Sequence, residues 1–180
     1  MEFELVRRAQ GGDEEAFAAL VPAATDRLMG VAYRILHDAS LAEDATQQAL
    51  LEAWRNLPKL RDPGRFEAWT YRLVVHACYA EARRNGPWRR LRLLAATEPR
   101  GRDESTDVVN RDRIARGFRG LSTQHRAVLV LHHYVGMPLT EVATLLDLPV
   151  GTVRSRLHYA SRALRSVIER DDALPAQGVT

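Results

Sequence analysis

Cysteine, lysine and long apolar runs are scarce or absent in this chain of 180 residues. A single cysteine, Cys78, excludes an internal disulfide and any zinc site built from several cysteines. No run of about 18 apolar residues is present to span a membrane, and the N-terminus lacks the charged-then-apolar pattern of a secretory signal. We therefore expect a cytoplasmic protein without a membrane-inserted segment.

Residue patterns that support catalysis or metal binding are missing as well. His76 and Cys78 are two positions apart, so on a helix they point to different faces and cannot act as base and nucleophile for each other. The histidines show no His-Glu-x-x-His spacing, and the adjacent His132 and His133 diverge on a helix. No glycine-rich phosphate loop or paired-carboxylate motif occurs. We expect no enzymatic activity, no cofactor and no metal site.

The charge that is present is unevenly distributed. The net charge is only +3, but residues 13–60 hold eight acids and four bases, whereas residues 111–170 hold four acids and ten bases. An acidic front and a basic back imply different partners for the two parts. Among the 26 basic residues only Lys59 is a lysine. Arginine suits phosphate and guanine contacts, although a GC-rich genome would produce the same excess.

Residues 139–165 are the most informative segment because they predict two helices joined by a tight turn. The first helix runs over 139–146, and the turn is Asp147-Leu148-Pro149, where proline cannot continue a helix. The second helix carries an apolar stripe at helical spacing. Its members are Val153, Leu157, Ala160 and Leu164.

The opposite face of this second helix is polar and basic. Donors at the start of such a helix can reach base edges in the major groove. The alternative is a solvated basic helix packed on a bundle. The residues of this face are Thr152, Arg154, Ser155, His158, Tyr159 and Arg162.

Helical periodicity continues through the rest of the chain, with no alternating strand pattern. Helices are predicted at about 13–36, 40–55, 66–84, 107–119 and 122–135. Ser40 and Glu43 form a capping box for the second of them, and Gly86-Pro87 is expected to end the third. The fold class is therefore all-α. We predict two small helical domains, residues 1–86 and 108–170, joined by a flexible linker (87–107) and followed by a short tail (171–180).

Two segments of the front half suggest binding surfaces. In residues 42–54 an apolar face that includes Trp54 leaves an outer face of Glu43, Asp44, Gln47, Gln48 and Glu52, which fits a basic protein surface or plain solvation equally well. In residues 66–84 aromatic rings and guanidiniums mix, which is the combination that single-stranded nucleic acid requires. Trp69, Leu73, His76 and Ala80 form one stripe of that helix, and Trp69 favours the core, whereas Tyr71 and Tyr79 fit either role.

Together these segments resemble a bacterial RNA polymerase sigma factor of the extracytoplasmic-function (ECF) type, group 4, in the sigma-70 family. The likeness covers about residues 10–84 and 110–168, and the segments follow the family's order and separation. It implies that residues 1–86 are sigma region 2, which binds core polymerase and recognises and melts the −10 element. Residues 108–170 would be sigma region 4, whose helix-turn-helix recognises the −35 element.

The resemblance also implies roles for individual residues. Those facing the clamp helices of core polymerase would be Glu43, Asp44, Gln47, Gln48 and Trp54. Those holding the −10 strand would be Trp69, Tyr71, Arg72, His76, Tyr79, Arg83 and Arg84. Those reading the −35 duplex would be Thr152, Arg154, Ser155, His158, Tyr159 and Arg162.

Several positions depart from the family pattern. Gln48 replaces a common glutamate, and His76 and Ala80 stand where asparagine and aspartate are frequent. Asp147 occupies the usual turn glycine, and Tyr159 an arginine of many members. Pro138 stands at a common serine cap. These departures bear mainly on promoter sequence.

The resemblance implies a protein that binds core RNA polymerase at its clamp helices and flap, and promoter DNA as −35 duplex and −10 single strand. An inhibitory anti-sigma factor is a further implied partner. The alternative is a helix-turn-helix regulator that binds an operator without polymerase. That alternative gives the two front segments no role.

Overall fold

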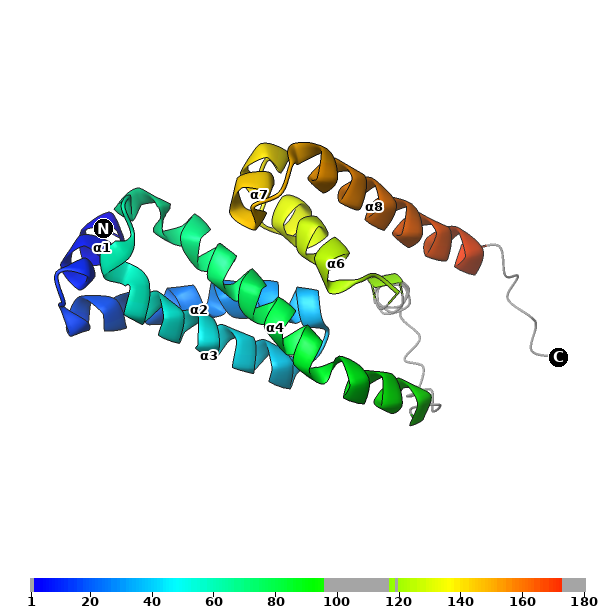
Figure 1. Cartoon of the computed structure of the whole chain (residues 1–180), viewed down its shortest axis with the longest axis horizontal. Coiled ribbons are helices and arrows are strands. Elements are labelled where there is room, and N and C mark those ends of the chain that lie inside the picture. Colours follow the sequence, from blue (N-terminus) through cyan, green and yellow to red (C-terminus); the bar gives the residue numbers. More distant parts are fainter. Residues whose placement is uncertain (1, 96–116, 119, 173–180) are drawn as a thin grey trace.

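The computed structural model describes residues 2–95, 117, 118 and 120–172, and all regular elements within these residues are helices (Figure 1). This confirms the predicted all-α class. Most of the expected helix at 107–119, of the expected linker and of the expected tail lies outside the described residues. In chain order the elements are α1 (Glu2–Gln10), α2 (Glu14–Leu36), α3 (Ala39–Asn56), the short helices η1 (Leu57–Lys59) and η2 (Pro63–Arg65), α4 (Phe66–Ala95), α6 (Thr123–Leu129), a π-helical turn η3 (Val130–Tyr134), α7 (Leu139–Leu146) and α8 (Val150–Asp172).

The helix ends follow the capping rules, with two corrections to the sequence predictions. Asp13 caps α2 as expected, since its side chain accepts a 2.9 Å hydrogen bond from the Ala16 N–H. Helix α3 is capped by Asp38, which accepts from the Leu41 N–H, and the predicted capping box at Ser40 is wrong. Helix α4 continues past Gly86-Pro87 to Ala95. A proline interrupts one backbone hydrogen bond but does not have to end a long helix.

Helices α1 to α4, with η1 and η2, form a front bundle. Leu28, Val31 and Ile35 of α2 are fully buried against small residues of α3 and against Val74 and Val75 of α4. The alanines that α3 presents let the helices approach closely; they are Ala42, Ala45 and Ala49. Burial of each large aliphatic side chain contributes about 1.5–3 kcal/mol. These residues anchor α3 with its opposite face outward.

A second apolar cluster joins α1 to the connection between α3 and α4. Val6 of α1 packs with Leu20, Leu57 and Phe66. The Gln10 side-chain amide donates to the carbonyl oxygens of Leu57 (3.2 Å) and Leu60 (2.6 Å). Helix α1 therefore fixes the connection that precedes α4.

Helices α6, η3, α7 and α8 form a rear bundle. In α8 Val153 and Ala160 are buried, and Leu157 and Leu164 pack as partly buried residues, so the predicted stripe is confirmed. Asp147 ends α7 in the left-handed conformation (φ 54°, ψ 50°). Aspartate tolerates this conformation better than most residues because its short side chain bonds locally. The helix-turn-helix thus closes without glycine.

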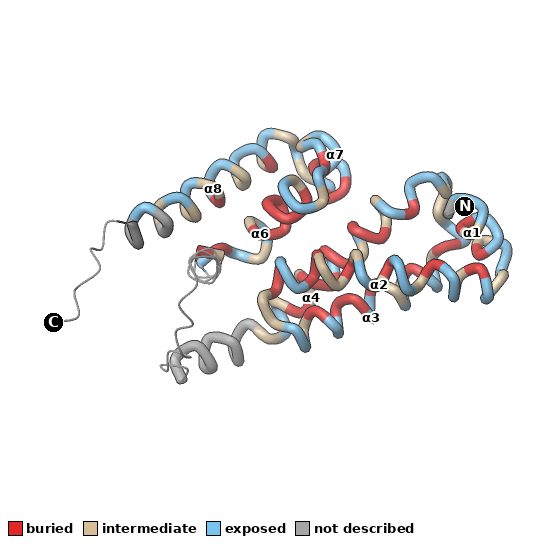
Figure 2. The backbone as a smooth tube through the Cα atoms, turned by 180° about the vertical axis from the view of Figure 1, so that it is seen from behind, coloured by how far each residue is buried: buried red, intermediate tan, exposed pale blue. Residues whose placement is uncertain are grey.

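The two bundles pack against each other, with α6 and α7 over α2 and α4 (Figures 1 and 2). One apolar core is continuous through both: Val74 and Cys78 of α4 belong to the same cluster as Val128 and Leu131. This contact also explains why burial on α4 is not confined to the stripe of Trp69, Leu73, His76 and Ala80. His76 is exposed, and partners on more than one side of the helix bury other residues, among them Thr70, Tyr71, Val75 and Ala77.

A close contact at Gly30 marks the boundary between the bundles. A Cβ atom at this position would lie 2.8 Å from the Tyr134 hydroxyl oxygen. The Arg34 guanidinium lies 3.7 Å from the centroid of the Tyr134 ring and donates to the Gly30 carbonyl. Glycine at position 30 therefore lets the Tyr134 phenol rest on α2.

We predict that Asp147→Gly increases the free energy of unfolding by about 0.5–1 kcal/mol, because glycine adopts positive φ without steric cost. Asp147→Val should decrease it, since a β-branched residue is disfavoured there. Urea unfolding followed by circular dichroism measures both. A destabilising Asp147→Gly would contradict the role of the left-handed turn.

We also predict that Gly30→Leu displaces the Tyr134 phenol from α2, because a Cβ at this position would lie 2.8 Å from its hydroxyl oxygen. The phenol is the end of a half-exposed side chain, so the change should lower the free energy of unfolding by about 1–3 kcal/mol and leave the shared core in place. Urea unfolding followed by circular dichroism measures the loss. Gly151→Leu is the control, as nothing lies within 4 Å of a Cβ at that position. Equal free energies of unfolding for both variants would contradict the prediction.

Candidate functional site

The outer face of α3 carries the polar residues predicted for protein binding. Glu43, Asp44, Gln47 and Gln48 are all exposed, while the opposite face of the helix is buried in the front bundle. The buried residues are Ala42, Ala45, Thr46, Ala49 and Ala53. Glu52 is half-buried. The helix therefore presents carboxylates and amides on one side, as the spacing predicted.

Apolar side chains extend this face. Trp54 was expected in the buried face but is 37% exposed, and its ring lies against Phe17 in a tilted arrangement, with centroids 4.7 Å apart and planes inclined by 54°. Leu51 is 50% exposed. Phe17, Val21, Pro22 and Trp54 are among the residues that line a shallow cavity of about 480 Å³. Leu51 was not among the residues predicted from the sequence, although its position four residues after Gln47 places it on the same helical face.

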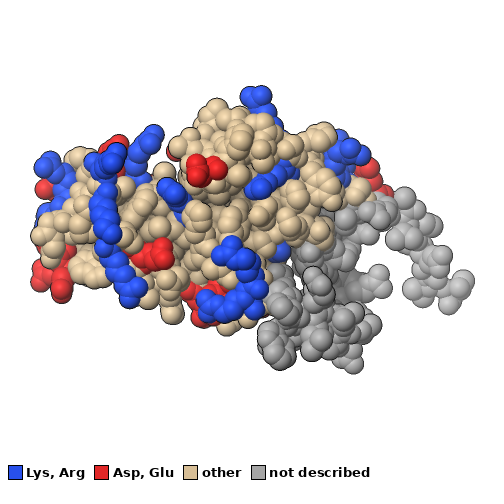
Figure 3. Space-filling model, viewed as in Figure 1, with Lys and Arg blue, Asp and Glu red and all other residues tan. Residues whose placement is uncertain are grey.

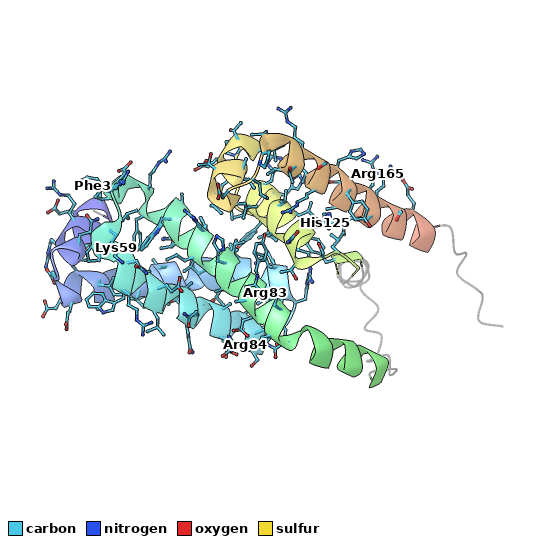
Figure 4. The ribbon with its side chains drawn as sticks, in the orientation of Figure 1. Phe3, Lys59, Arg83, Arg84, His125 and Arg165 are labelled. Atoms are coloured by element: carbon cyan, nitrogen blue, oxygen red, sulfur yellow. The ribbon has the colours of Figure 1, made fainter. Side chains whose placement is uncertain are left out.

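The basic residues predicted on α4 are accessible. Arg72 and His76 are exposed, as are Arg83 and Arg84 (Figure 4). Arg84 forms a 2.7 Å ion pair with the buried Glu81. Partial burial lowers the pKa of His76, and Arg72 lowers it further, with Glu52 acting in the opposite direction. The arginines supply positive charge along one side of α4, and the lowered pKa of His76 favours a neutral imidazole among them.

The aromatic residues predicted on α4 are covered in this arrangement. Tyr71 is 6% exposed and donates to the Glu67 carboxylate (3.1 Å), and burial together with Glu67 raises its pKa to about 12. Tyr79 is partly buried with its hydroxyl oxygen enclosed, and burial raises its pKa to about 12 while Arg156 of α8 opposes that shift. Trp69 is half-buried beside Phe66. DNA reaches Tyr71 and Tyr79 only if the rear bundle moves.

A cleft of about 630 Å³ lies between the bundles beside these residues. Arg65, Trp69 and Arg72 line it from the front, and Thr140 and Glu141 of α7 line it from the rear. The front wall thus presents two guanidiniums and a tryptophan ring. Arg65 was not among the residues predicted from the sequence.

The outer face of α8 presents the predicted DNA-reading residues. Arg154, Ser155, His158, Tyr159 and Arg162 are exposed, and Thr152 is half-buried at the helix start. Figure 3 shows basic side chains over both bundles on one face of the molecule. The exposed donors of α8 lie on a helix that its buried stripe anchors to the rear bundle.

Cys78 lies in the apolar core, away from this chemistry. Burial, and secondarily Glu81, raises the pKa of its thiol to about 12. Within the described residues no three or more histidine, cysteine or acidic side chains are grouped to hold a metal ion. None of the described helices is long and apolar enough to cross a bilayer.

Comparison with known proteins identifies both parts of the chain. Residues 20–87 match Sigma-70 region 2, and residues 117–166 match Sigma-70, region 4. The ECF RNA polymerase sigma factor SigL of Mycobacterium tuberculosis is 35% identical over 169 residues, covering 88% of this chain and 94% of SigL. The RNA polymerase sigma-H factor of Pseudomonas aeruginosa is 29% identical, covering 92% of this chain and 93% of its own.

Solved structures show the same fold. CnrH in complex with the cytosolic domain of CnrY aligns with a TM-score of 0.69 at 25% identity, covering 94% of this chain and 98% of the matched chain. The sigma factor RpoE, in complex with the anti-sigma factor NepR from Bartonella quintana, aligns with a TM-score of 0.65 at 18% identity over 85% of this chain and 96% of the matched one. The second likeness concerns the fold alone.

We predict that Cys78 reacts with a disulfide reagent at pH 8 at least about 100-fold more slowly in the native protein than in denaturant, because the thiolate is the reactive form. Its raised pKa and its burial act in the same direction. The absorbance of the released thiol measures the rate, and the denatured chain supplies the full signal. A native rate equal to that of free cysteine would contradict the buried placement.

Proposed function

The chain belongs to the ECF RNA polymerase sigma factors of the sigma-70 family, and we propose that within them it is a cytoplasmic group 4 member without catalytic activity. It binds core RNA polymerase and directs promoter-specific initiation of transcription. One observation supports separate binding surfaces for polymerase and DNA. Helix α3 of the front bundle exposes an acidic and amide face, and α8 of the rear bundle exposes a basic face. One face suits a protein partner and the other suits DNA.

For polymerase binding we propose the outer face of α3, defined by Glu43, Asp44, Gln47, Gln48 and Trp54. Its exposed carboxylates suit a basic partner surface, and complementary charge speeds encounter. Leu51 and Trp54 supply the apolar contacts that a stable interface concentrates at its centre. The buried alanine side of α3 holds this face rigid. The partner is the clamp helices of the largest polymerase subunit, and the flap is the contact of the rear bundle.

For −10 recognition we propose α4. Its exposed guanidiniums hold the phosphate backbone, and its aromatic rings stack on unpaired bases once the rear bundle has moved. Extrusion of a base from the duplex costs a few kcal/mol, which these contacts offset. The residues of this site are Trp69, Tyr71, Arg72, His76, Tyr79, Arg83 and Arg84.

For −35 recognition we propose α8 in the major groove. Thr152 and Arg154 at the start of the helix would meet the duplex, and further donors follow along the exposed face of the helix. Phosphate contacts set the position of the helix and base contacts set the sequence that it prefers. The remaining residues of this site are Ser155, His158, Tyr159 and Arg162.

An anti-sigma factor is a further partner that we propose for this chain. The similar sigma factor RpoE was solved with the anti-sigma factor NepR. On this chain Leu51 and Trp54 are exposed, and Trp54 lines a shallow cavity with the half-buried Phe17, so that apolar surface is available to such a protein. An inhibitor that covers it would deny polymerase the α3 face.

An operator-binding regulator that acts without polymerase is the other candidate. It would use the same face of α8, and it predicts specific duplex binding by the isolated protein. It assigns no role to the exposed acidic face of α3. The sigma factor accounts for both faces.

We predict that the double variant Asp44→Ala, Gln47→Ala abolishes discrete run-off transcripts that core RNA polymerase makes with the wild-type protein on fragmented genomic DNA. Removal of two central interface contacts should weaken holoenzyme formation by about 10-fold or more. The matched control is Asp26→Ala, Gln124→Ala, which removes the same groups from exposed positions of α2 and α6. Normal transcription by the first variant would contradict the α3 assignment.

A further inference from the structure

The recognition helix α8 makes an aromatic contact with a neighbouring helix. The ring of His125 in α6 stacks on the ring of Tyr159 in α8, with centroids 4.7 Å apart and planes inclined by 30°. Figure 4 shows His125 between these two helices. The contact joins a residue outside the helix-turn-helix to the exposed face of α8.

His125 is itself held in place. Its Nδ1 atom lies 2.7 Å from the Ser122 hydroxyl oxygen, and its backbone N–H donates to the same oxygen at 3.3 Å. Ser122 is the N-cap of α6, so the imidazole is attached to a helix end. Burial, and secondarily Arg156, lowers the pKa of His125, which favours the neutral ring. A neutral imidazole stacks on a phenol without adding charge.

The exposure of Tyr159 explains why a contact that fixes its rotamer matters. Its side chain is 60% exposed, and an exposed aromatic side chain on a helix exchanges between rotamers. Ordering a side chain on binding weakens affinity, whereas a side chain that is already ordered avoids this loss. The stack orders the ring and leaves the hydroxyl free to meet a base edge.

We propose that His125 is a positioning residue that orients Tyr159 and thereby sets the base preference of this protein at the −35 element. The proposal rests on the proposed function, because it takes α8 as the −35 reader. It is based on the geometry of the contacts that Ser122 and Tyr159 make with His125. A residue of α6 would then determine specificity without touching DNA.

The test uses the full chain with core RNA polymerase on a promoter library randomised at the −35 element, with transcripts counted by sequencing. His125→Ala should reduce the preference for the favoured base at one position by about 3- to 10-fold, the range expected for loss of an aromatic pair and of preorganisation. Preferences at the other positions should stay unchanged. His125→Phe retains a ring and should retain most of the preference.

A double-mutant cycle with Tyr159→Ala separates positioning from a general structural role. If His125 acts through Tyr159, the His125→Ala change has no effect on base preference when Tyr159 is already alanine. His133→Ala is the matched control, an exposed histidine of the same bundle whose ring lies against His132. Thermal unfolding checks that each variant is folded.

Three results would overturn the proposal. One is an equal loss at all positions for His125→Ala, and another is an additive effect in the cycle. The third is unchanged −35 preference in Tyr159→Ala while the wild-type protein transcribes, which removes Tyr159 as a reader but leaves the sigma factor function standing. Absence of transcripts with the wild-type protein would instead remove the proposed function itself.

Discussion

The apolar contact between α4 and the rear bundle determines which surfaces of this protein are available. Val74 and Cys78 lie in one continuous core with Val128 and Leu131, so the two bundles share buried surface. That sharing covers Tyr71 and encloses the hydroxyl of Tyr79. It leaves the outer faces of α3 and α8 in solvent. Exposure on this molecule is therefore set by packing between bundles as much as by packing within each.

Much of the front and rear bundles was predictable from periodicity. The faces of α3 and α8 follow from apolar residues at helical spacing, and the caps and turn follow from local chemistry at Asp13 and Asp147. Periodicity is less informative at α4, where buried residues surround much of the helix and His76 is exposed. A helix with partners on more than one side has no single apolar face. Its continuation past Gly86-Pro87 goes against a local helix-breaking signal, which a long helix can accommodate.

The contacts that distinguish this chain could not be predicted because they join residues far apart in sequence. Nothing near Gly30 indicates that it receives the phenol of Tyr134. Similarly, the spacing of α8 places Tyr159 outward but says nothing of His125. The exposed fraction of Trp54 depends on Phe17 in another helix. The sequence thus predicted which face of a helix is exposed, whereas the residues that contact that face could be identified only from the structure.

The closed packing has a consequence for the order of binding on the proposed assignments. A ligand that binds only the open arrangement has its apparent affinity reduced by the fraction of protein that is open, so that an open fraction of about 1% weakens it about 100-fold. The melted −10 strand is such a ligand, because the rear bundle covers the aromatic residues of α4. Polymerase at α3 and duplex at α8 meet faces that are already exposed. Polymerase and duplex can thus bind the two bundles before the bundles separate. Their binding then supplies the energy that holds the bundles apart, before the single strand is captured.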